Sequence, residues 1–461
     1  MTTMAQRDKK NATSRVHKGD GLHQEKVRAI YHFLEENLYF NRPDLEIDGR
    51  KFNTSLLFGL LTALNGGKEL IIGEPGVGKT TSAEFVGSLV YRIPVGVIWG
   101  SEVSGHPEQT EEKIIGRPDL GKLNKGVEEV VWTHFSQIPV KIVDEINRLP
   151  ETKQSMILDG VDRGNWEYLN EMIINEEYCL FATANYQDQG TNTIIPPMID
   201  RFDILVESRH PGANISYLVG KHWDKENILR HAQLERDFQE VLNRKVPYHN
   251  KVTQLEEVSN RFGEFLDAKL SLKSLSHEER QTIQSQTRQI EFTLDASAFT
   301  RMVLSELSFC YHHGQKRCVE NCAEGCHYTG YLCHEIKNCA SNRLPMSIRS
   351  YSQIFAWFLE DQEVDVEHVK AVIPYTLAHR IQWRDEHLAR LEKSRRNDPF
   401  MIFMAKEAVK EILRRYDEQR DRVKEALGVG FRILKGEDLE PVEGDHPVYE
   451  EIKNDLELEF L

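Results

Sequence analysis

The chain has 461 residues, a length that predicts two or three domains. Hydrophobic residues make up 40% of it and aromatic residues 9%, enough for buried cores, so we expect a mainly folded protein. The formal net charge of −15, from 58 basic and 73 acidic residues, argues weakly against a dedicated non-specific nucleic-acid binder, because such proteins are normally basic.

The start of the chain shows no targeting or membrane segment. Residues 1–18, MTTMAQRDKKNATSRVHK, are polar and basic and lack the apolar region of a secretory signal. The apolar run LLFGLLTAL at residues 56–64 is far shorter than a membrane span. We therefore expect a cytoplasmic protein. The stretch ENLYFN at 36–41 resembles a protease-tag scar, but Asn41 stands where that site needs Gln, so we interpret it as native helix-end sequence.

A strand, a glycine-rich loop and a helix are predicted between residues 68 and 92. ELII predicts a strand at Glu69–Ile72, GEPGVGKT fits the G-x-x-x-x-G-K-[ST] pattern, and Ala83, Val86 and Val90 then fall on one helical face. In this order, backbone N–H groups can surround phosphates and the helix N-terminus adds a favourable dipole. The expected nucleotide-binding residues are Gly73, Glu74, Pro75, Gly76, Val77, Gly78, Lys79, Thr80 and Thr81.

A second predicted strand, Val140–Asp144, ends in two carboxylates. Asp144 is expected to hold Mg²⁺ mostly through water, together with the Thr80 hydroxyl, while Lys79 contacts the β- and γ-phosphates. Glu145 is placed to polarise the attacking water. ATP and Mg²⁺ are therefore the expected cofactors. The alternative, an acidic pair that caps a helix, does not explain why the pair ends a buried strand downstream of a P-loop.

Further strands are predicted at Tyr178–Thr183, at Ile204–Val206 and at Ile93–Trp99. Asn185 follows the first of these at the carboxyl edge of the sheet, where ligands bind in open α/β sheets. Arg201 precedes the second, where it either forms a structural salt bridge or reaches the γ-phosphate of a neighbouring subunit. The alternation of strands with helical segments predicts a parallel sheet with helices on both faces.

These motifs, together with two later segments, resemble the MoxR branch of the AAA+ ATPases. The resemblance is carried by GEPGVGKTT, IVDEINRLPETKQSMILDGVD, FATANYQDQGTNTIIPPMIDRFD, SIRSYSQIF and VDVEHVKAVIPYTLAHRI. It implies that Asp144 and Glu145 are the Mg²⁺-binding and catalytic carboxylates, Asn185 is the sensor-1 residue and Arg201 is an arginine finger that acts in trans. It also implies that Arg349 is the sensor-2 arginine of a lid, with Arg301 as the competing candidate.

The family fold implied is an α/β P-loop AAA+ core with a parallel five-stranded sheet, followed by an enlarged all-helical lid. We expect an N-terminal tail and helix at 1–50, the core at 51–211, the lid with a Cys-rich insertion (310–339) at 212–385, and a C-terminal helix and acidic tail at 386–461. Residues 437–461 hold ten acidic residues against one basic residue, Lys453. This composition predicts a solvated, partly disordered end, with a partner-docking tail as the alternative.

The resemblance implies Mg²⁺-dependent ATP hydrolysis by a hexameric ring that remodels or activates partner proteins. Such partners often carry a von Willebrand A domain. A motor acting on nucleic acid remains the alternative. A non-enzymatic, nucleotide-gated scaffold is disfavoured because both Glu145 and Arg201 are present.

Six of the seven cysteines lie between residues 310 and 339. A disulfide framework is not expected in a cytosolic chain, and the polar residues between the thiols are not typical of a core. Metal ligation is left, either by an iron–sulfur cluster or by zinc, for which His327 or His334 could replace a thiolate. The candidate ligands are Cys310, Cys318, Cys322, Cys326, Cys333 and Cys339.

Overall fold

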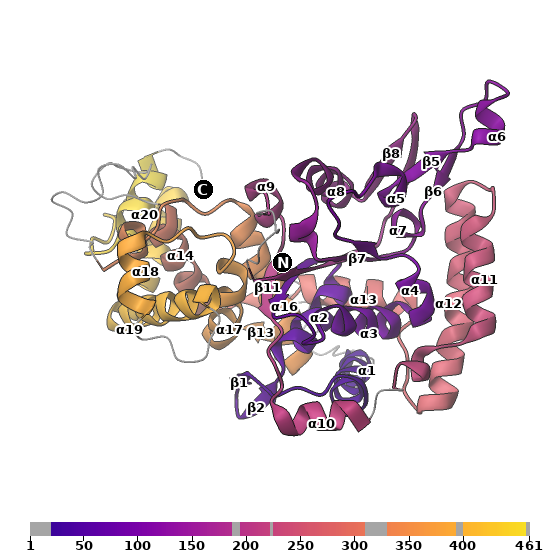
Figure 1. Cartoon of the computed structure of the whole chain (residues 1–461). Helices are drawn as coiled ribbons and strands as arrows, with labels where there is room; N and C mark the ends of the chain where they lie inside the picture. The colour runs from indigo at the N-terminus through magenta and orange to yellow at the C-terminus, as the bar shows by residue number, and fades with distance from the viewer. Residues whose placement is uncertain (1–19, 187–193, 222–224, 309–329, 393–399, 458–461) are drawn as a thin grey trace, which may run out of the picture.

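A parallel five-stranded sheet forms the centre of the computed structural model (Figure 1), which describes residues 20–186, 194–221, 225–308, 330–392 and 400–457. The strand order is β11-β3-β10-β7-β4, and every neighbouring pair is parallel. The strands are β3 (Lys68–Gly73), β4 (Val103–Ser104), β7 (Val140–Asp144), β10 (Cys179–Asn185) and β11 (Ile204–Glu207). The predicted fold class is confirmed.

Helices α2 (Thr54–Asn65) and α3 (Lys79–Tyr91) pack directly on this sheet. Both are almost entirely buried, and so is β10, which pairs with β3 on one side and with β7 on the other. Asn53 caps α2 by accepting a hydrogen bond from the Leu56 N–H. The apolar run at 56–64 is therefore a core helix.

The strand predicted at Ile93–Trp99 is wrong. The structure has a short helix there, α4 (Val95–Trp99), and the fifth strand is β4. Pro94 stands at the N-cap of α4, and the helix packs against α11 (Ala232–Asn243). A short apolar run that is buried on several sides has no periodicity that separates a helix from a strand, which is why the sequence pattern misled.

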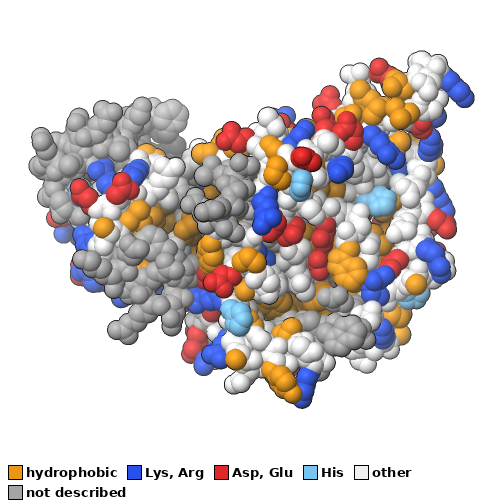
Figure 2. All heavy atoms as spheres, viewed as in Figure 1, with side chains coloured by type: hydrophobic (Ala, Val, Ile, Leu, Met, Phe, Trp, Pro, Cys, Tyr) orange, Lys and Arg blue, Asp and Glu red, His pale blue; other side chains and the backbone are white. Residues whose placement is uncertain are grey.

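Two β-hairpins project from the core at the upper right of Figure 1. One pairs β5 (Gly116–Pro118) with β6 (Val130–Trp132) and carries α6 (Leu120–Leu123) at its tip. The other pairs β8 (Asn165–Tyr168) with β9 (Glu171–Ile174). Figure 2 shows hydrophobic side chains gathered on this projecting part of the surface. The elements that flank the hairpins are α5 (Glu111–Ile114), α7 (His134–Gln137), η2 (Ile146–Arg148) and α8 (Glu151–Arg163).

The helical remainder lies on two sides of the core. At one side α11 packs on α12 (Tyr248–Leu270), and α13 (His277–Arg288) joins α12 to the helices below the sheet. At the other side, seen at the left of Figure 1, α14 (Leu294–Ser308) packs with α17 (Val366–Leu377), α19 (Phe400–Leu434) and α20 (Pro447–Glu457). The other elements are α1 (Asp20–Phe33), η1 (Leu34–Leu38), β1 (Leu45–Ile47), β2 (Arg50–Phe52), α9 (Pro196–Ile199), α10 (Ala213–Lys221), η3 (Lys225–Leu229), β12 (Glu291–Phe292), α15 (Leu332–Glu335), α16 (Arg343–Leu359), β13 (Glu363–Val364) and α18 (Asp385–Glu392).

The end of the acidic C-terminal segment forms the packed helix α20, so the prediction of a solvated, partly disordered end is wrong for residues 447–457, whereas residues 437–445 are mostly exposed. Val448, Tyr449 and Ile452 are buried against α14 and α19. Three apolar side chains on one face of an acidic helix are enough to dock it, and the sequence count of acidic residues hid them. None of the helices in the described ranges combines the length and the hydropathy that a bilayer crossing requires.

Glu69, the second residue of β3, is a charged residue type in an apolar position. Its side chain is fully buried, and neither carboxylate oxygen has a hydrogen-bond partner within the described residues. Burial raises the pKa of Glu69 to about 8. The group is therefore protonated in the folded protein at neutral pH, where an unfolded chain would ionise it.

We expect Glu69→Gln to remove a pH-dependent part of the stability. Because the folded pKa is raised, the stabilisation from Glu69 is complete below pH 4.5 and is lost as the pH rises towards about 8. Urea unfolding at pH 5 and pH 8 measures the effect. The free energy of unfolding of the variant, relative to that of the native protein, should be higher at pH 8 than at pH 5 by a few kcal/mol. A difference in unfolding free energy that stays constant between the two pH values would contradict a protonated Glu69.

Candidate nucleotide site

The P-loop runs from β3 into α3 and depends on three glycines with positive φ, Gly73, Gly76 and Gly78. At Gly73 a Cβ would lie 2.4 Å from the Ser208 carbonyl oxygen, so no other residue fits there without moving the backbone. Gly78 is the N-cap residue of α3 in the left-handed region. These conformations turn the loop around the helix N-terminus, an arrangement that suits an anion such as a phosphate.

Lys79 is held at the centre of this loop. Its Nζ donates to the carbonyl oxygens of Gly73 (3.0 Å) and Glu74 (2.7 Å) and to Oδ1 of Asn185 (2.8 Å). Burial lowers the pKa of Lys79, and the nearby Asp144 and Glu145 carboxylates oppose that shift. The structure thus brings together the predicted lysine and the predicted sensor residue.

Asp144 lies at the end of β7 and is fixed by two hydroxyl groups. Its Oδ1 accepts hydrogen bonds from Thr80 Oγ1 (2.6 Å) and Thr183 Oγ1 (2.7 Å). Thr183 belongs to the neighbouring strand β10 and also accepts a hydrogen bond from the Glu145 N–H at 2.9 Å. The Thr80 hydroxyl and the Asp144 carboxylate are therefore side by side, as two ligands or water-mediated ligands of one Mg²⁺ would be.

Glu145 occupies a strained backbone position. Its φ is 51°, in the left-handed region that non-glycine residues rarely adopt. Its carboxylate accepts a 2.7 Å hydrogen bond from Asn185 Nδ2 and lies 3.1 Å from Arg148 Nε. Asn185 thus touches both Lys79 and Glu145, so that one amide orients the cation and the candidate base together. Strain of this kind is typical of functional sites.

Several supporting residues were missed from the sequence. Tyr39 packs over Gly78 and its hydroxyl lies 2.8 Å from Ser208 Oγ, which donates to the Val77 carbonyl. Residues 36–41 are thus part of the P-loop support, and only the fold brings them there. Burial, followed by the charge of Glu84, raises the pKa of Glu102 to about 9, which adds a protonated carboxyl near Asp144.

The site fits MgATP. The loop offers backbone N–H groups and a cation to phosphates, and the strand edge offers a hydroxyl and a carboxylate to a hard divalent cation. Bound Mg²⁺ would neutralise charge on the β- and γ-phosphates. The remaining contribution of the protein is positioning: Asn185 holds Lys79 and Glu145 in fixed orientations, and Thr183 holds Asp144 and the Glu145 backbone.

Residues 69–210 match the family model described as "ATPase family associated with various cellular activities (AAA)". The chain carries an AAA ATPase domain. It is an ATPase, which converts ATP and water to ADP and phosphate. The crystal structure of a protein from Cytophaga hutchinsonii, described as a "putative ATPase", is similar to this chain, with a TM-score of 0.54 and 15% identity over 86% of this chain and 95% of that one. At this identity the likeness shows the fold alone. None of the curated proteins matches the chain.

Arg201 lies away from the nucleotide site of its own AAA domain. It precedes β11, and Asp203 N donates to the Lys68 carbonyl at the amino end of β3, whereas the P-loop follows the carboxyl end of that strand. The strand has six residues, a length of about 20 Å. Arg201 Nε lies 3.2 Å from Asp162 Oδ1, and Arg343 Nη2 lies 3.7 Å from the same oxygen. Two arginines, one from the core and one from α16, therefore share one carboxylate.

The structure does not bring Arg349 to the nucleotide site of its own chain, and its sensor-2 role stays a prediction. Arg349 is 3.6 Å from Glu291 and stacks over Phe292, and it is more than half exposed. Nearby on α16, the Tyr351 hydroxyl forms a 2.7 Å hydrogen bond with Thr62 Oγ1. Thr62 lies in the last turn of α2, the helix that precedes β3 in the chain. The lid helix α16 thus packs at the amino edge of the sheet, because aromatic residues on its buried face seat it there. The competing Arg301 is exposed on α14, near Glu451 and Asp455 of α20.

Four of the six clustered cysteines, Cys310, Cys318, Cys322 and Cys326, lie outside the described residues. Cys333 is buried and Cys339 is exposed. Among the residues that the structure describes, no group of three or more His, Cys, Asp or Glu side chains is arranged to hold a metal. The iron–sulfur or zinc site therefore stays a prediction.

Proposed function

We propose that the chain acts as a MoxR-like AAA+ ring that couples ATP hydrolysis to the remodelling of partner proteins. The hydrogen-bonded chain from Lys79 through Asn185 to Glu145 carries this proposal, because it joins the phosphate-binding cation to the candidate base. Lys79 and the P-loop hold the phosphates, Thr80 and Asp144 hold Mg²⁺, and Glu145 orients and deprotonates the attacking water.

The proposal requires a neighbouring subunit. A transferring phosphoryl group spreads charge that an inserted arginine stabilises strongly, and Arg201 lies one strand length away from the P-loop of its own chain. Arg201 therefore serves the site of the next subunit, and Arg343 lies beside it on the same carboxylate. A head-to-tail contact of this kind closes into a ring, and the family resemblance favours six subunits.

We expect Arg201→Ala to bind nucleotide normally and to lose ATPase activity by about a thousandfold, as other trans arginines do. The measurements are nucleotide affinity by titration and steady-state phosphate release. Arg414→Ala is the matched control for charge, because Arg414 is exposed on α19, where it pairs with Glu411 and Glu418, and it takes no part in the nucleotide site. An unchanged steady-state rate of ATP hydrolysis by Arg201→Ala would contradict the role of Arg201 in the neighbouring site.

Partner proteins, including ones with a von Willebrand A domain, are the proposed targets, and a nucleic-acid motor is the alternative. ATPase rates with an unfolded protein, duplex DNA and single-stranded DNA at physiological salt distinguish the two. We expect stimulation by protein, in keeping with the net charge of −15, which opposes phosphate binding. Stimulation by DNA alone would reverse the assignment.

A further inference from the structure

A large cavity lies on the far side of the core from the nucleotide site. Its volume is about 1040 Å³, and its lining includes Ile138 and Pro139, which lead into β7, and Ile93, which follows α3. Asp144 is at the other end of that strand, so the cavity is separated from the Mg²⁺-binding edge by the length of β7. The walls come from the hairpins β5–β6 and β8–β9 and from α11 and α12.

In each hairpin, the strand that comes second in the chain lies at the cavity, and we call it the outer strand. Glu171–Ile174 of β9 and Val130–Trp132 of β6 line it, whereas the inner partners β8 and β5 do not. The two outer strands do not pair with each other in a ladder, and the Val130 N–H donates to Glu171 Oε1 at 3.0 Å. Gln137 Nε2 also donates to the Trp132 carbonyl at 3.2 Å, so side chains occupy the β6 edge and the edge of β9 is the one that stays open to the cavity.

The register of the second hairpin shows which backbone groups face outwards. Asn175 N donates to the Gly164 carbonyl, which makes that pair hydrogen-bonded, and hydrogen-bonded pairs alternate along an antiparallel ladder. Met172 and Ile174 therefore belong to the alternate pairs, and their N–H and C=O groups point away from β8. Within the described residues, no hydrogen bond joins these groups to another segment.

The side chains around this edge are apolar and exposed. Met172 is 54% exposed and Ile174 is 50% exposed, although both are large hydrophobic residues. Val131 on β6 and Val252 on α12 are also exposed and line the same cavity. Apolar side chains at every second residue, beside free backbone donors and acceptors, are what an added strand requires.

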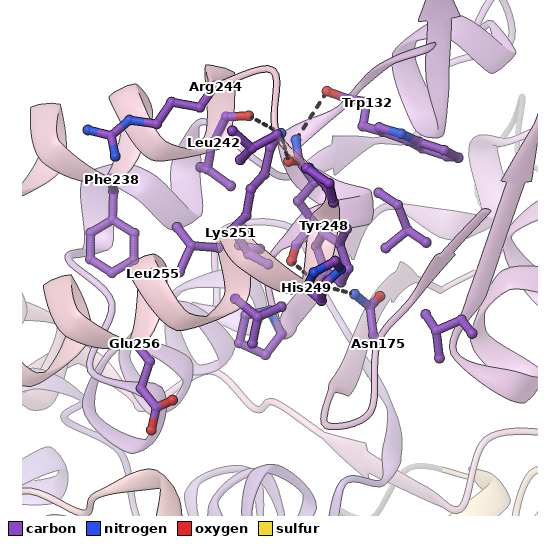
Figure 3. Close-up of a pocket in the computed structure, with 18 of the residues that line it drawn as sticks. Trp132, Asn175, Phe238, Leu242, Arg244, Tyr248, His249, Lys251, Leu255 and Glu256 are labelled. Atoms are coloured by element: carbon purple, nitrogen blue, oxygen red, sulfur yellow. Dashed lines mark hydrogen bonds between the residues drawn. The ribbon is translucent and has the colours of Figure 1, made fainter. Parts of the chain in front are cut away.

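The opposite wall combines apolar side chains with hydrogen-bonded polar ones (Figure 3). Tyr248 of α12 donates to the Gln137 carbonyl at 2.7 Å and accepts from Asn175 Nδ2 at 2.6 Å. Lys251 Nζ donates to Gln137 Oε1 (2.7 Å) and to the Leu242 carbonyl (2.8 Å). These bonds tie α12 to α7 and to the segment after β9.

We propose that this cavity binds an extended polypeptide segment, which adds a strand to the outer edge of β9 and places alternate apolar side chains against Met172, Ile174 and Val252. The volume lies at the upper end of the range of small-molecule sites, roughly 300 to 1000 Å³, so the free strand edge, and not the volume, selects a peptide backbone. The inference rests on the proposed function only in that a remodelling ATPase has to hold a polypeptide. Polypeptide binding is measured without nucleotide, so the binding site and the ATP-driven remodelling can each be contradicted independently of the other.

Met172→Pro tests the strand edge directly. Proline removes the outward N–H and adds a ring on the cavity side, while the hydrogen bonds inside the hairpin stay. Glu167→Pro is the matched control. Glu167 pairs with Met172 in the register of the hairpin, but it belongs to β8, and β8 does not line the cavity. The probe is fluorescein-labelled casein, an unfolded polypeptide, measured by fluorescence anisotropy with the full chain.

We expect Met172→Pro to weaken casein binding by about tenfold or more and Glu167→Pro to leave it unchanged, because main-chain hydrogen bonds supply affinity in strand addition. Hydrogen exchange should slow at the Met172 and Ile174 amides of the native chain when casein is added. ATPase activity without casein should be equal in all three proteins. The proposal is overturned if casein does not bind, if both proline variants bind alike, or if only single-stranded DNA or a small apolar dye protects these amides.

Discussion

Glu145→Gln should bind ATP with unchanged affinity and lose hydrolysis by a factor of about 10² to 10⁴, the usual contribution of a general base. The amide keeps the size of the side chain and can still contact Asn185 and Arg148, which hold Glu145 at 2.7 Å and 3.1 Å. It cannot take a proton from water. Nucleotide titration and single-turnover phosphate release measure the two effects separately.

Lys79→Ala is the companion variant, and it should abolish nucleotide binding itself. Lys79 is 7% exposed and donates to two P-loop carbonyls, so its loss removes both the phosphate cation and a loop restraint. A Glu145→Gln protein that hydrolyses ATP at the native rate would show that another group activates the water. Asn185→Asp would then be the next variant to examine, since Asn185 contacts both side chains.

Glu306→Ala should destabilise the C-terminal helical part by about 3 to 5 kcal/mol, the usual cost of breaking a buried ion pair. Glu306 is fully buried on α14 and binds Arg415 Nε at 2.9 Å and Nη2 at 2.7 Å. It also accepts from the Leu332 N–H and lies 3.2 Å from His446 Nε2. One carboxylate thus joins α14, α15, α19 and the segment before α20.

The pH dependence of this cluster has a definite sign. Burial alone would raise the pKa of Glu306, but the hydrogen bond with His446 and the charge of Arg415 lower it below its ordinary value of 4.5. The stabilisation is therefore present at neutral pH and is lost in acid below pH 4.5. Urea unfolding of the native protein, Glu306→Ala and Glu411→Gln measures it. Glu411 forms an exposed ion pair with Arg414, and both residues lie on α19. Its loss should lower the free energy of unfolding by less than about 1 kcal/mol. Equal losses would contradict the buried cluster.

The nucleotide-binding half was predictable because its chemistry is local. A P-loop is a contiguous motif, and carboxylates that end an apolar strand must lie at the carboxyl edge of a parallel sheet. Lys79, Asp144 and Asn185 therefore converge as expected. The sequence did not predict the role of Thr183, because that role arises from the pairing of β10 with β7. It did not predict the role of Tyr39 either, because Tyr39 contacts Ser208, which lies 169 residues away in the sequence.

Predictions that depended on long-range packing did worse. Spacing within a family motif predicts that Arg349 belongs to the lid, but it does not determine where α16 docks. The aromatic residues Tyr351, Phe355 and Phe358 decide that, by packing on Phe58 and Phe52. The fold of the acidic tail depends likewise on a few buried residues of α20 against α14, a contact between segments far apart in the chain.

Mixing two inactive variants tests the shared site most directly. Arg201→Ala keeps an intact P-loop and Glu145, and Glu145→Gln keeps an intact Arg201, so a mixed ring contains complete sites wherever the second variant follows the first. With random assembly of equal amounts, about a quarter of the sites are complete, and the account predicts ATPase activity of about a quarter of the native rate. Activity that stays at the level of the separate variants would contradict a site completed by the neighbouring subunit.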